Sequence, residues 1–107
     1  MSFHWVSREA RLKIIDVLLS SRSIKQLASE LGVSPTAVRK YVYRRAYPDD
    51  EVISRALSIL APYEKEKVYE VLVEDILSSV KTLITMIDDP RLRKKARERI
   101  VESVAGE

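Results

Sequence analysis

The chain has 107 residues, of which 46% are hydrophobic and 33% are charged, and it contains no cysteine. This composition is typical of one small folded domain, or of a small domain with an appendage, and it is too apolar for a disordered protein. The missing cysteines exclude disulfide bonds and thiolate metal sites. Because no apolar run approaches the roughly 20 residues of a membrane span and the N-terminus shows no secretory pattern, we expect a cytoplasmic protein that contacts no membrane.

The net charge of +3 is unevenly distributed along the chain. Residues 1–48 carry nine Lys/Arg and three Asp/Glu, residues 49–90 carry four and ten, and residues 91–107 carry six and three. The two ends are therefore basic and the middle is acidic. We infer that only parts of the surface meet a polyanion such as nucleic acid.

Amide side chains are almost missing, since asparagine is absent and Gln26 is the only glutamine. Selection against thermolabile amides, together with abundant charged residues, is typical of thermophilic proteins. We therefore hypothesise a thermophilic, archaeal source.

Apolar residues recur at helical spacing along the whole chain, and no segment shows the alternation of a strand. With breaks at glycine and proline, this pattern predicts an all-α protein of six helices. The expected ranges are about 7–20, 23–32, 35–44, 50–60, 62–87 and 90–105. We expect four short helices to form a head domain, 1–61, and the remaining two to form a helical dimerisation region, 62–107.

Several residues mark where the short helices begin and end. Ser7, Ser23 and Ser34 are candidate N-caps, and Gln26 completes a capping box with Ser23. Gly32 is suited to the left-handed backbone that ends a helix. Short, well-marked helices of this kind favour a compact head.

Residues 24–41 read IKQLASELGVSPTAVRKY, which predicts two short helices joined by a tight turn. Ala28 is small enough for two helices to approach closely, and Gly32 lies where the first helix must stop. The buried side is expected to consist of Leu27, Leu31, Val33, Val38 and Tyr41. This is the layout of a helix-turn-helix that places its second helix in the major groove of DNA.

The longer stretch SIKQLASELGVSPTAVRKYVYRRAYPDDEVISRALSIL resembles the lambda-repressor-like (Xre/Cro-type) DNA-binding domain. The matching positions are Ala28, the turn Gly32-Val33-Ser34, Thr36, Val38 and Pro48. The resemblance covers about 40 residues, or about 60 with the first helix. It implies a helical head that binds duplex DNA through residues 35–44.

Two positions depart from the family's pattern. Ile24 stands where the family often has a glutamine that clamps a phosphate, and Arg44 stands where it commonly has glycine. Because an arginine resists a left-handed backbone, we expect the loop at Arg44 to be reshaped and to gain a phosphate contact.

The exposed face of residues 35–44 supplies the candidates for base contact. Thr36, Arg39 and Lys40 can bind base edges and phosphates, and arginine can form a bidentate pair with guanine. The alternative is that they only solubilise a surface helix. Pro35 and Thr36 occupy the helix end that usually lies nearest the bases.

The flanking contacts are expected to reach the DNA backbone. Tyr43, Arg44, Arg45 and Tyr47 form a basic patch with interleaved aromatics, which indicates a phosphate clamp or, alternatively, a solvated helix cap. The full set of expected DNA-binding residues is Ser23, Lys25, Ser34, Pro35, Thr36, Arg39, Lys40, Tyr43, Arg44 and Arg45.

The expected long helix carries an apolar stripe at a 4-3-4-3-4 spacing, which favours a dimer interface over a purely internal core helix. The stripe consists of Tyr69, Val73, Ile76, Val80, Leu83 and Ile87. Leu72, Leu77 and Ile84 are expected to widen it. The basic run from Arg91 to Arg99 is interpreted as a solvated face in preference to a second DNA contact.

Enzymatic function is not expected, and neither a cofactor nor a metal site is predicted. The single histidine, His4, is expected to be exposed, and there is no glycine-rich phosphate loop. Trp5 is expected to anchor the N-terminal segment on the core.

The sequence thus predicts a homodimeric, sequence-specific DNA-binding protein that regulates transcription from a pseudo-palindromic site. A first alternative keeps DNA binding but assigns it to plasmid or chromosome partition, or to a mobile element. A second alternative is a helical adaptor that binds a partner protein through its C-terminal helices and does not bind DNA.

Overall fold

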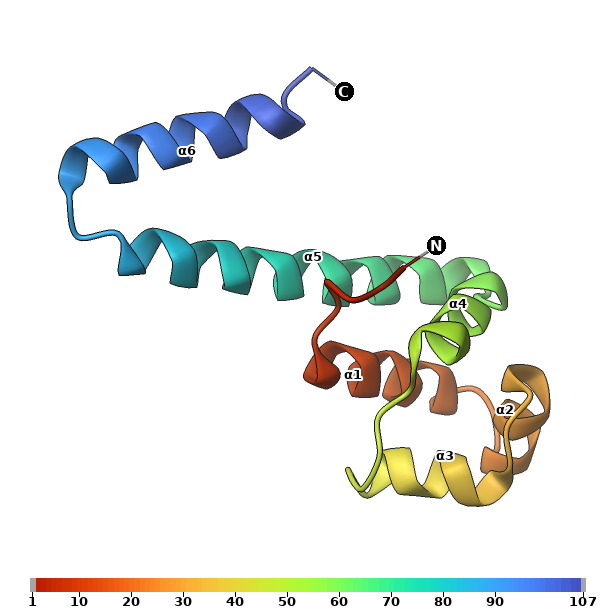
Figure 1. The fold of residues 1–107 in the computed structure, drawn as a ribbon. Helices are drawn as coiled ribbons and strands as arrows, with labels where there is room; N and C mark the ends of the chain where they lie inside the picture. Colours follow the sequence, from red (N-terminus) through yellow and green to blue (C-terminus); the bar gives the residue numbers. More distant parts are fainter. Residues whose placement is uncertain (1, 107) are drawn as a thin grey trace. The chain divides into compact units, whose positions relative to one another are not determined.

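The computed structural model describes residues 2–106, which form six α-helices and no strand (Figure 1). The helices are α1 (Arg8–Leu19), α2 (Ile24–Leu31), α3 (Pro35–Val42), α4 (Asp50–Ser58), α5 (Pro62–Met86) and α6 (Pro90–Val104). The predicted all-α class is confirmed, and each helix lies where the sequence pattern places it.

Side-chain N-caps begin five of the six helices. Each capping side chain accepts a hydrogen bond from a backbone N–H in the first turn of its helix, which satisfies a donor that has no partner inside the helix. The caps are Ser7, Ser23, Ser34, Asp49 and Asp89. The capping box predicted at Ser23 is only half formed, since the side-chain amide of Gln26 donates to Glu30 Oε1 at 3.3 Å.

The turn after α2 depends on Gly32, whose φ is 71°. The N–H of Val33 donates to the carbonyl of Ala28 at 3.0 Å, which is the long bond of a Schellman motif. Arg55 of α4 reaches this turn and donates from Nη1 to the carbonyl of Leu31 at 3.2 Å. A Cβ at position 32 would meet the Arg55 guanidinium, so glycine suits this position both by conformation and by space.

The turn after α3 has the same form, although no glycine is present. Arg44 has a φ of 58°, and the N–H of Arg45 donates to the carbonyl of Lys40 at 2.8 Å. The N–H of Arg44 donates to the carbonyl of Tyr41 at 3.1 Å. The expectation that arginine would reshape this loop is therefore wrong, because Arg44 adopts the left-handed conformation in which glycine is usual.

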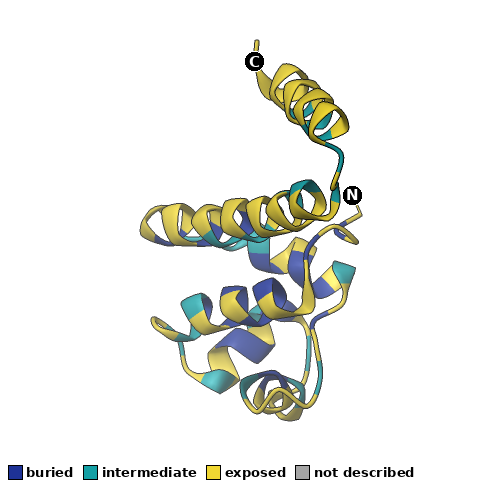
Figure 2. Cartoon of the chain, turned by 90° about the vertical axis from the view of Figure 1, so that its left-hand side faces the viewer, coloured by how far each residue is buried: buried dark blue, intermediate teal, exposed yellow. Residues whose placement is uncertain are grey.

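The chain divides into two compact units, Met1–Asp75 and Ile76–Glu107. The first unit holds the hydrophobic core, formed by α1–α4 together with Val68 and Leu72 of α5 (Figure 2). The most deeply buried apolar side chains are Leu12, Ile14, Ile15, Leu18, Leu27, Leu31, Val38, Ile53 and Val68. The predicted boundary between residues 61 and 62 lies ahead of this division, because the first half of α5 contributes to the core of the head.

Arg11 is a buried cation that connects three segments of the first unit. Its guanidinium donates to the carbonyls of Val6 at 3.1 Å, Pro48 at 2.9 Å and Phe3 at 2.6 Å. It also forms an ion pair with Asp50 Oδ1 at 2.7 Å, and this contact lowers the pKa of the Asp50 carboxyl. The N-terminal segment, α1 and the start of α4 are thereby fixed to one another.

The anchor of the N-terminal segment is Phe3 and not Trp5. Phe3 is 6% exposed and belongs to the core, whereas Trp5 is 43% exposed. The two rings lie 6.3 Å apart between centroids. The prediction for Trp5 is therefore wrong, and the smaller aromatic ring takes the buried position.

Glu64, in the first turn of α5, is a buried carboxylate with a full set of donors. Arg22 donates to its carboxylate through Nη1 at 2.7 Å and through Nη2 at 3.1 Å. Ser21 donates to it through Oγ at 2.8 Å, and Ala61 donates through its backbone N–H at 2.9 Å. Arg22 also donates to Glu30 of α2 at 2.7 Å. These contacts lower the pKa of Glu64 to about 2, with the hydrogen bonds from Arg22 as the main cause. The start of α5 is thus joined to α2 and to the α1–α2 connection.

The second unit consists of the end of α5, a short turn and α6. Asp89 caps α6, and Arg93 Nε donates to the carbonyl of Ile87 at 2.9 Å, so the turn is held by side chains from α6 and from its cap. None of the α6 residues is buried. Ala96 and Ile100 are half-buried, whereas Leu92, Val101 and Val104 of α6 are exposed in the single chain.

Candidate nucleic-acid interface

α3 presents one face to the core and the other to solvent. Val38 and Tyr41 are buried, and burial raises the pKa of the Tyr41 hydroxyl. Ala28 of α2, 1% exposed, lies in the same core and allows α2 and α3 to pack closely. The buried face fixes the orientation of α3, so its outer face is a rigid surface.

The outer face of α3 carries the predicted base-contacting residues. Thr36, Arg39 and Lys40 are all exposed, as are Ser34 and Pro35 at the start of the helix. Within residues 2–106 neither Arg39 nor Lys40 forms an ion pair with a carboxylate. Both cations are therefore available to bind an anion.

Arg44 and Arg45 follow α3 but have different surroundings. Arg44 forms a two-pronged ion pair with Asp16 of α1, with nitrogen–oxygen distances of 2.8 and 3.3 Å, and this pair raises the pKa of the arginine. Arg45 is exposed and makes no side-chain contact with an acidic residue of the described chain. Tyr43 beside them is 71% exposed. The structure thus leaves Arg45 as the free cation of the predicted clamp.

Tyr47, the second aromatic of that patch, belongs to a different neighbourhood. The guanidinium carbon of Arg8 lies 5.3 Å from the centroid of its ring, which is a cation–π arrangement. Arg8 is the first residue of α1, so the patch extends from the end of α3 to the start of α1.

The start of α2 offers one cation and one hydroxyl. Lys25 is exposed, while the Ser23 hydroxyl accepts the N–H of Gln26 at 3.0 Å and keeps its own proton for another acceptor. Ile24 is half-buried and packs against the core. The side chain of Ile24 therefore adds apolar packing at the start of α2 and offers no hydrogen-bond donor to a phosphate.

Most of the Lys and Arg residues in 1–48 are not paired with a carboxylate of the described residues, so this part of the chain stays basic. Arg11, Arg22 and Arg44 are paired with carboxylates, and Asp16 and Glu30 are used in two of these pairs. The six cations left without a carboxylate partner in the described residues are Arg8, Lys13, Lys25, Arg39, Lys40 and Arg45. No local sequence signal marks Arg11 and Arg22 as buried, because a buried arginine has the same sequence pattern as an exposed one.

The predicted dimer stripe is largely exposed in the single chain. Tyr69, Val73, Ile76 and Leu83 are exposed, and Val80 and Ile87 are half-buried. Leu72, expected to widen the stripe, is instead buried in the head. The long helix therefore has two apolar faces, of which one packs on the head and one has no partner.

A groove of about 520 Å³ lies within the second unit, between the end of α5 and α6. Val80, Ile84, Ile100 and Val101 supply its apolar lining, and Lys81, Thr85 and Arg97 supply the polar part. This groove continues the exposed apolar surface of the second unit.

Comparisons with family models, curated proteins and solved structures return no match to this chain. In the part of the chain that the structure describes, no group of three or more His, Asp or Glu side chains is placed to hold a metal ion. In the same residues, no helix is long and apolar enough to cross a membrane.

Proposed function

We propose that α2 and α3 form a helix-turn-helix and that α3 binds in the major groove of duplex DNA. One observation carries this proposal: the outer face of α3 presents Arg39 and Lys40 without carboxylate partners, while Val38 and Tyr41 hold the opposite face in the core. A helix fixed in this way can place side chains at base edges with little loss of conformational entropy on binding.

The proposal divides the contacts into two classes. Thr36, Arg39 and Lys40 read base edges, and Lys25 and Arg45 bind phosphates on either side of the groove. Arg44 is paired with Asp16, whereas Arg45 has no carboxylate partner in the described residues, so Arg45 takes the larger part of the phosphate contact expected after α3.

We further propose that the protein is a homodimer and regulates transcription from a pseudo-palindromic site. The exposed stripe on α5 and the unburied α6 support self-association. Two copies of α3 would then enter major grooves about 34 Å apart. The same contacts would serve in partition or in a mobile element, and the DNA sequence selected by the protein distinguishes these uses.

The DNA proposal is tested by selecting bound duplexes from a random library and measuring affinity across a salt series. Affinity should fall with salt at a log–log slope of about −0.9 per phosphate neutralised. Arg39→Ala should reduce discrimination between selected and unrelated duplexes by about 1–3 kcal/mol, because it removes a base contact. Arg45→Ala should weaken all duplexes alike and reduce the slope by about 1.

Lys67→Ala is the matched control, because Lys67 is an exposed α5 cation outside this surface. It should leave both affinity and discrimination unchanged. Equal weakening of all duplexes by Arg39→Ala would overturn the base-reading role. An affinity independent of salt, or no binding at all, would favour the second candidate, a helical adaptor whose exposed α5 stripe binds another protein.

A further inference from the structure

An acidic row runs along one edge of the exposed stripe of α5. It consists of Glu66, Glu70 and Glu74, which are four residues apart and therefore lie above one another on the helix. All three are exposed, and within residues 2–106 none of them forms a salt bridge. Tyr69 and Val73 of the apolar stripe lie next to them on the helix surface.

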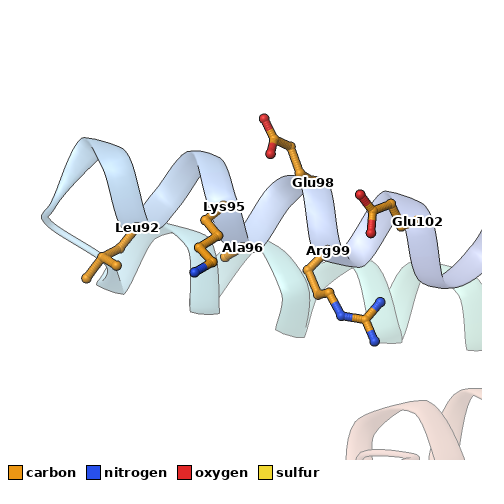
Figure 3. A pocket seen from close by; sticks show the side chains of 6 residues that line it. All are labelled: Leu92, Lys95, Ala96, Glu98, Arg99 and Glu102. Atoms are coloured by element: carbon orange, nitrogen blue, oxygen red, sulfur yellow. The ribbon is translucent and has the colours of Figure 1, made fainter.

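A basic row with the same spacing runs along α6 and consists of Arg91, Lys95 and Arg99. All three are exposed, and no carboxylate pairs with them in the described part of the chain. Lys95 and Arg99 extend to the same side of α6 as Leu92, while Glu98 extends to the opposite side (Figure 3). The basic row thus borders the apolar side of α6 as the acidic row borders that of α5.

Each row places like charges next to one another, and Lys67, Glu98 and Glu102, three residues from members of the rows, offset only part of the repulsion. Like charges four residues apart on a helix repel one another, and both rows contain two such pairs. Residues 62–89 hold seven Asp/Glu against three Lys/Arg, and residues 90–104 hold two against six. An acidic row set against a basic row would remove the repulsion in both helices at once.

If α6 ran antiparallel along α5 of the same chain, its basic row would not lie opposite the acidic row. Residues 87–89 join the helices, so Arg91–Arg99 would lie opposite residues of about 77–85 at 1.5 Å per residue. The one charged residue in that stretch is Lys81, which would repel the basic row. Glu74 lies 12 residues before the end of α5, roughly 18 Å away along the helix.

We propose that the basic row of α6 binds the acidic row on α5 of a second copy of this chain, with the apolar sides of the two helices packed together. In the symmetric dimer each chain contributes both rows, so six pairs of opposite charge border the interface. The proposal rests on the homodimer proposed above and names the surfaces that make it.

Two charge-reversal variants test this pairing. They are Glu66→Lys/Glu70→Lys/Glu74→Lys and Arg91→Glu/Lys95→Glu/Arg99→Glu. In each variant alone, both copies would present rows of like charge. Because an exposed ion pair changes association by about two-fold or more, the loss of six pairs should weaken dimerisation of each variant by at least roughly 60-fold.

An equimolar mixture of the two variants should restore dimerisation. The lysine row of one chain then meets the glutamate row of the other, and the remaining natural rows also match. Light scattering and native mass spectrometry at low salt measure the dimer and its composition. A control with Lys13→Glu, which reverses an exposed cation of α1, should dimerise as the unmodified chain does.

The outcomes separate this pairing from the dimer itself. A monomeric unmodified chain would overturn the homodimer and the pairing with it. Variants that remain homodimers, or a mixture that stays monomeric although circular dichroism shows both chains folded, would overturn the pairing alone. A heterodimer formed only in the mixture would support it, and none of these readouts depends on DNA.

Discussion

At the scale of single residues, four arginines of the first unit illustrate two kinds of surroundings. Arg11 and Arg22 are largely buried and donate to several backbone carbonyls as well as to carboxylates. Arg39 and Arg45 are exposed and have no carboxylate partner in the described residues. A buried guanidinium needs nearly all of its donors satisfied, which explains why the buried arginines lie where chain segments converge.

The two Schellman turns provide a prediction about backbone conformation. Gly32→Ala should lower the free energy of unfolding by about 1–2 kcal/mol, because an L residue is strained at a φ of 71°. Arg44→Gly should leave the protein as stable or make it more stable, since it relieves the same strain and removes only an exposed ion pair. Denaturant unfolding of both variants measures the difference.

Arg55→Ala is the control for Gly32→Ala, because it removes the guanidinium that a new methyl group would displace. If Arg55→Ala alone reproduced the full loss, the lost contact and not the backbone strain would be the cause. A clear loss of stability in Arg44→Gly would show that the Asp16 pair outweighs the strain.

At the scale of elements, α5 joins two structural roles in one helix. Glu64, Val68 and Leu72 lie on one face and are buried in the head, whereas Tyr69 and Val73 lie on another face and are exposed. Helical periodicity produces both faces, since residues four apart share a side. The buried face fixes the start of α5 to the elements that position α3.

The pH dependence of stability tests the connection between α5 and α2. Glu64 has a pKa of about 2 in the folded protein and of 4.5 without its partners, so the stabilisation is complete above about pH 4.5 and is lost as the pH falls towards 2. At 1.36 kcal/mol per pKa unit this amounts to about 3 kcal/mol. Glu64→Gln should therefore be less stable at pH 7 by a similar amount.

The informative quantity is the difference in unfolding free energy between the unmodified chain and Glu64→Gln, because other carboxylates titrate in the same range. This difference should be constant from pH 7 to about 5 and shrink as the pH falls towards 2. Parallel stability curves for the two proteins would contradict the assigned role. Glu9→Gln, an exposed carboxylate of α1 that forms no salt bridge in the described residues, is the control.

The sequence predicts the six helices and most of their caps because these depend on local signals. Ser34 before Pro35 marks a helix start and Gly32 after a helical pattern marks a helix end, and both signals depend only on adjacent residues. The role of Glu64 could not be predicted in the same way. Its partner Arg22 is 42 positions away, and an arginine on the surface has the same local pattern as one in the core.

The candidate site shows the same distinction. The exposed face of α3 follows from helical periodicity and from the apolar positions Val38 and Tyr41. The sequence could not show that Asp16 pairs with Arg44 and leaves Arg45 without a partner, because α1 and the turn after α3 come together only in the folded chain. Periodicity likewise found the exposed stripe on α5 but could not assign Leu72 to the head.

At the scale of the whole molecule, the head depends on part of the helix that also carries the proposed dimer stripe. A chain ending at Ala61 would lack Glu64, Val68 and Leu72. Burying the two aliphatic side chains contributes roughly 1.5–3 kcal/mol each, and Arg22 would lose its principal partner. Together these losses approach the roughly 5–15 kcal/mol that stabilises a typical domain.

We therefore expect a chain of residues 1–75 to fold cooperatively and to be monomeric, whereas a chain of residues 1–61 should be largely unfolded. Thermal unfolding followed by circular dichroism measures the first property, and light scattering the second. Equal stability of the two chains would mean that α5 is not part of the head. A dimeric 1–75 chain would show that α6 is not needed for the interface, which would then lie on the head or on the first half of α5. DNA binding by a monomeric 1–75 chain should be much weaker than that of the full chain, because only one copy of α3 would reach the DNA at a time.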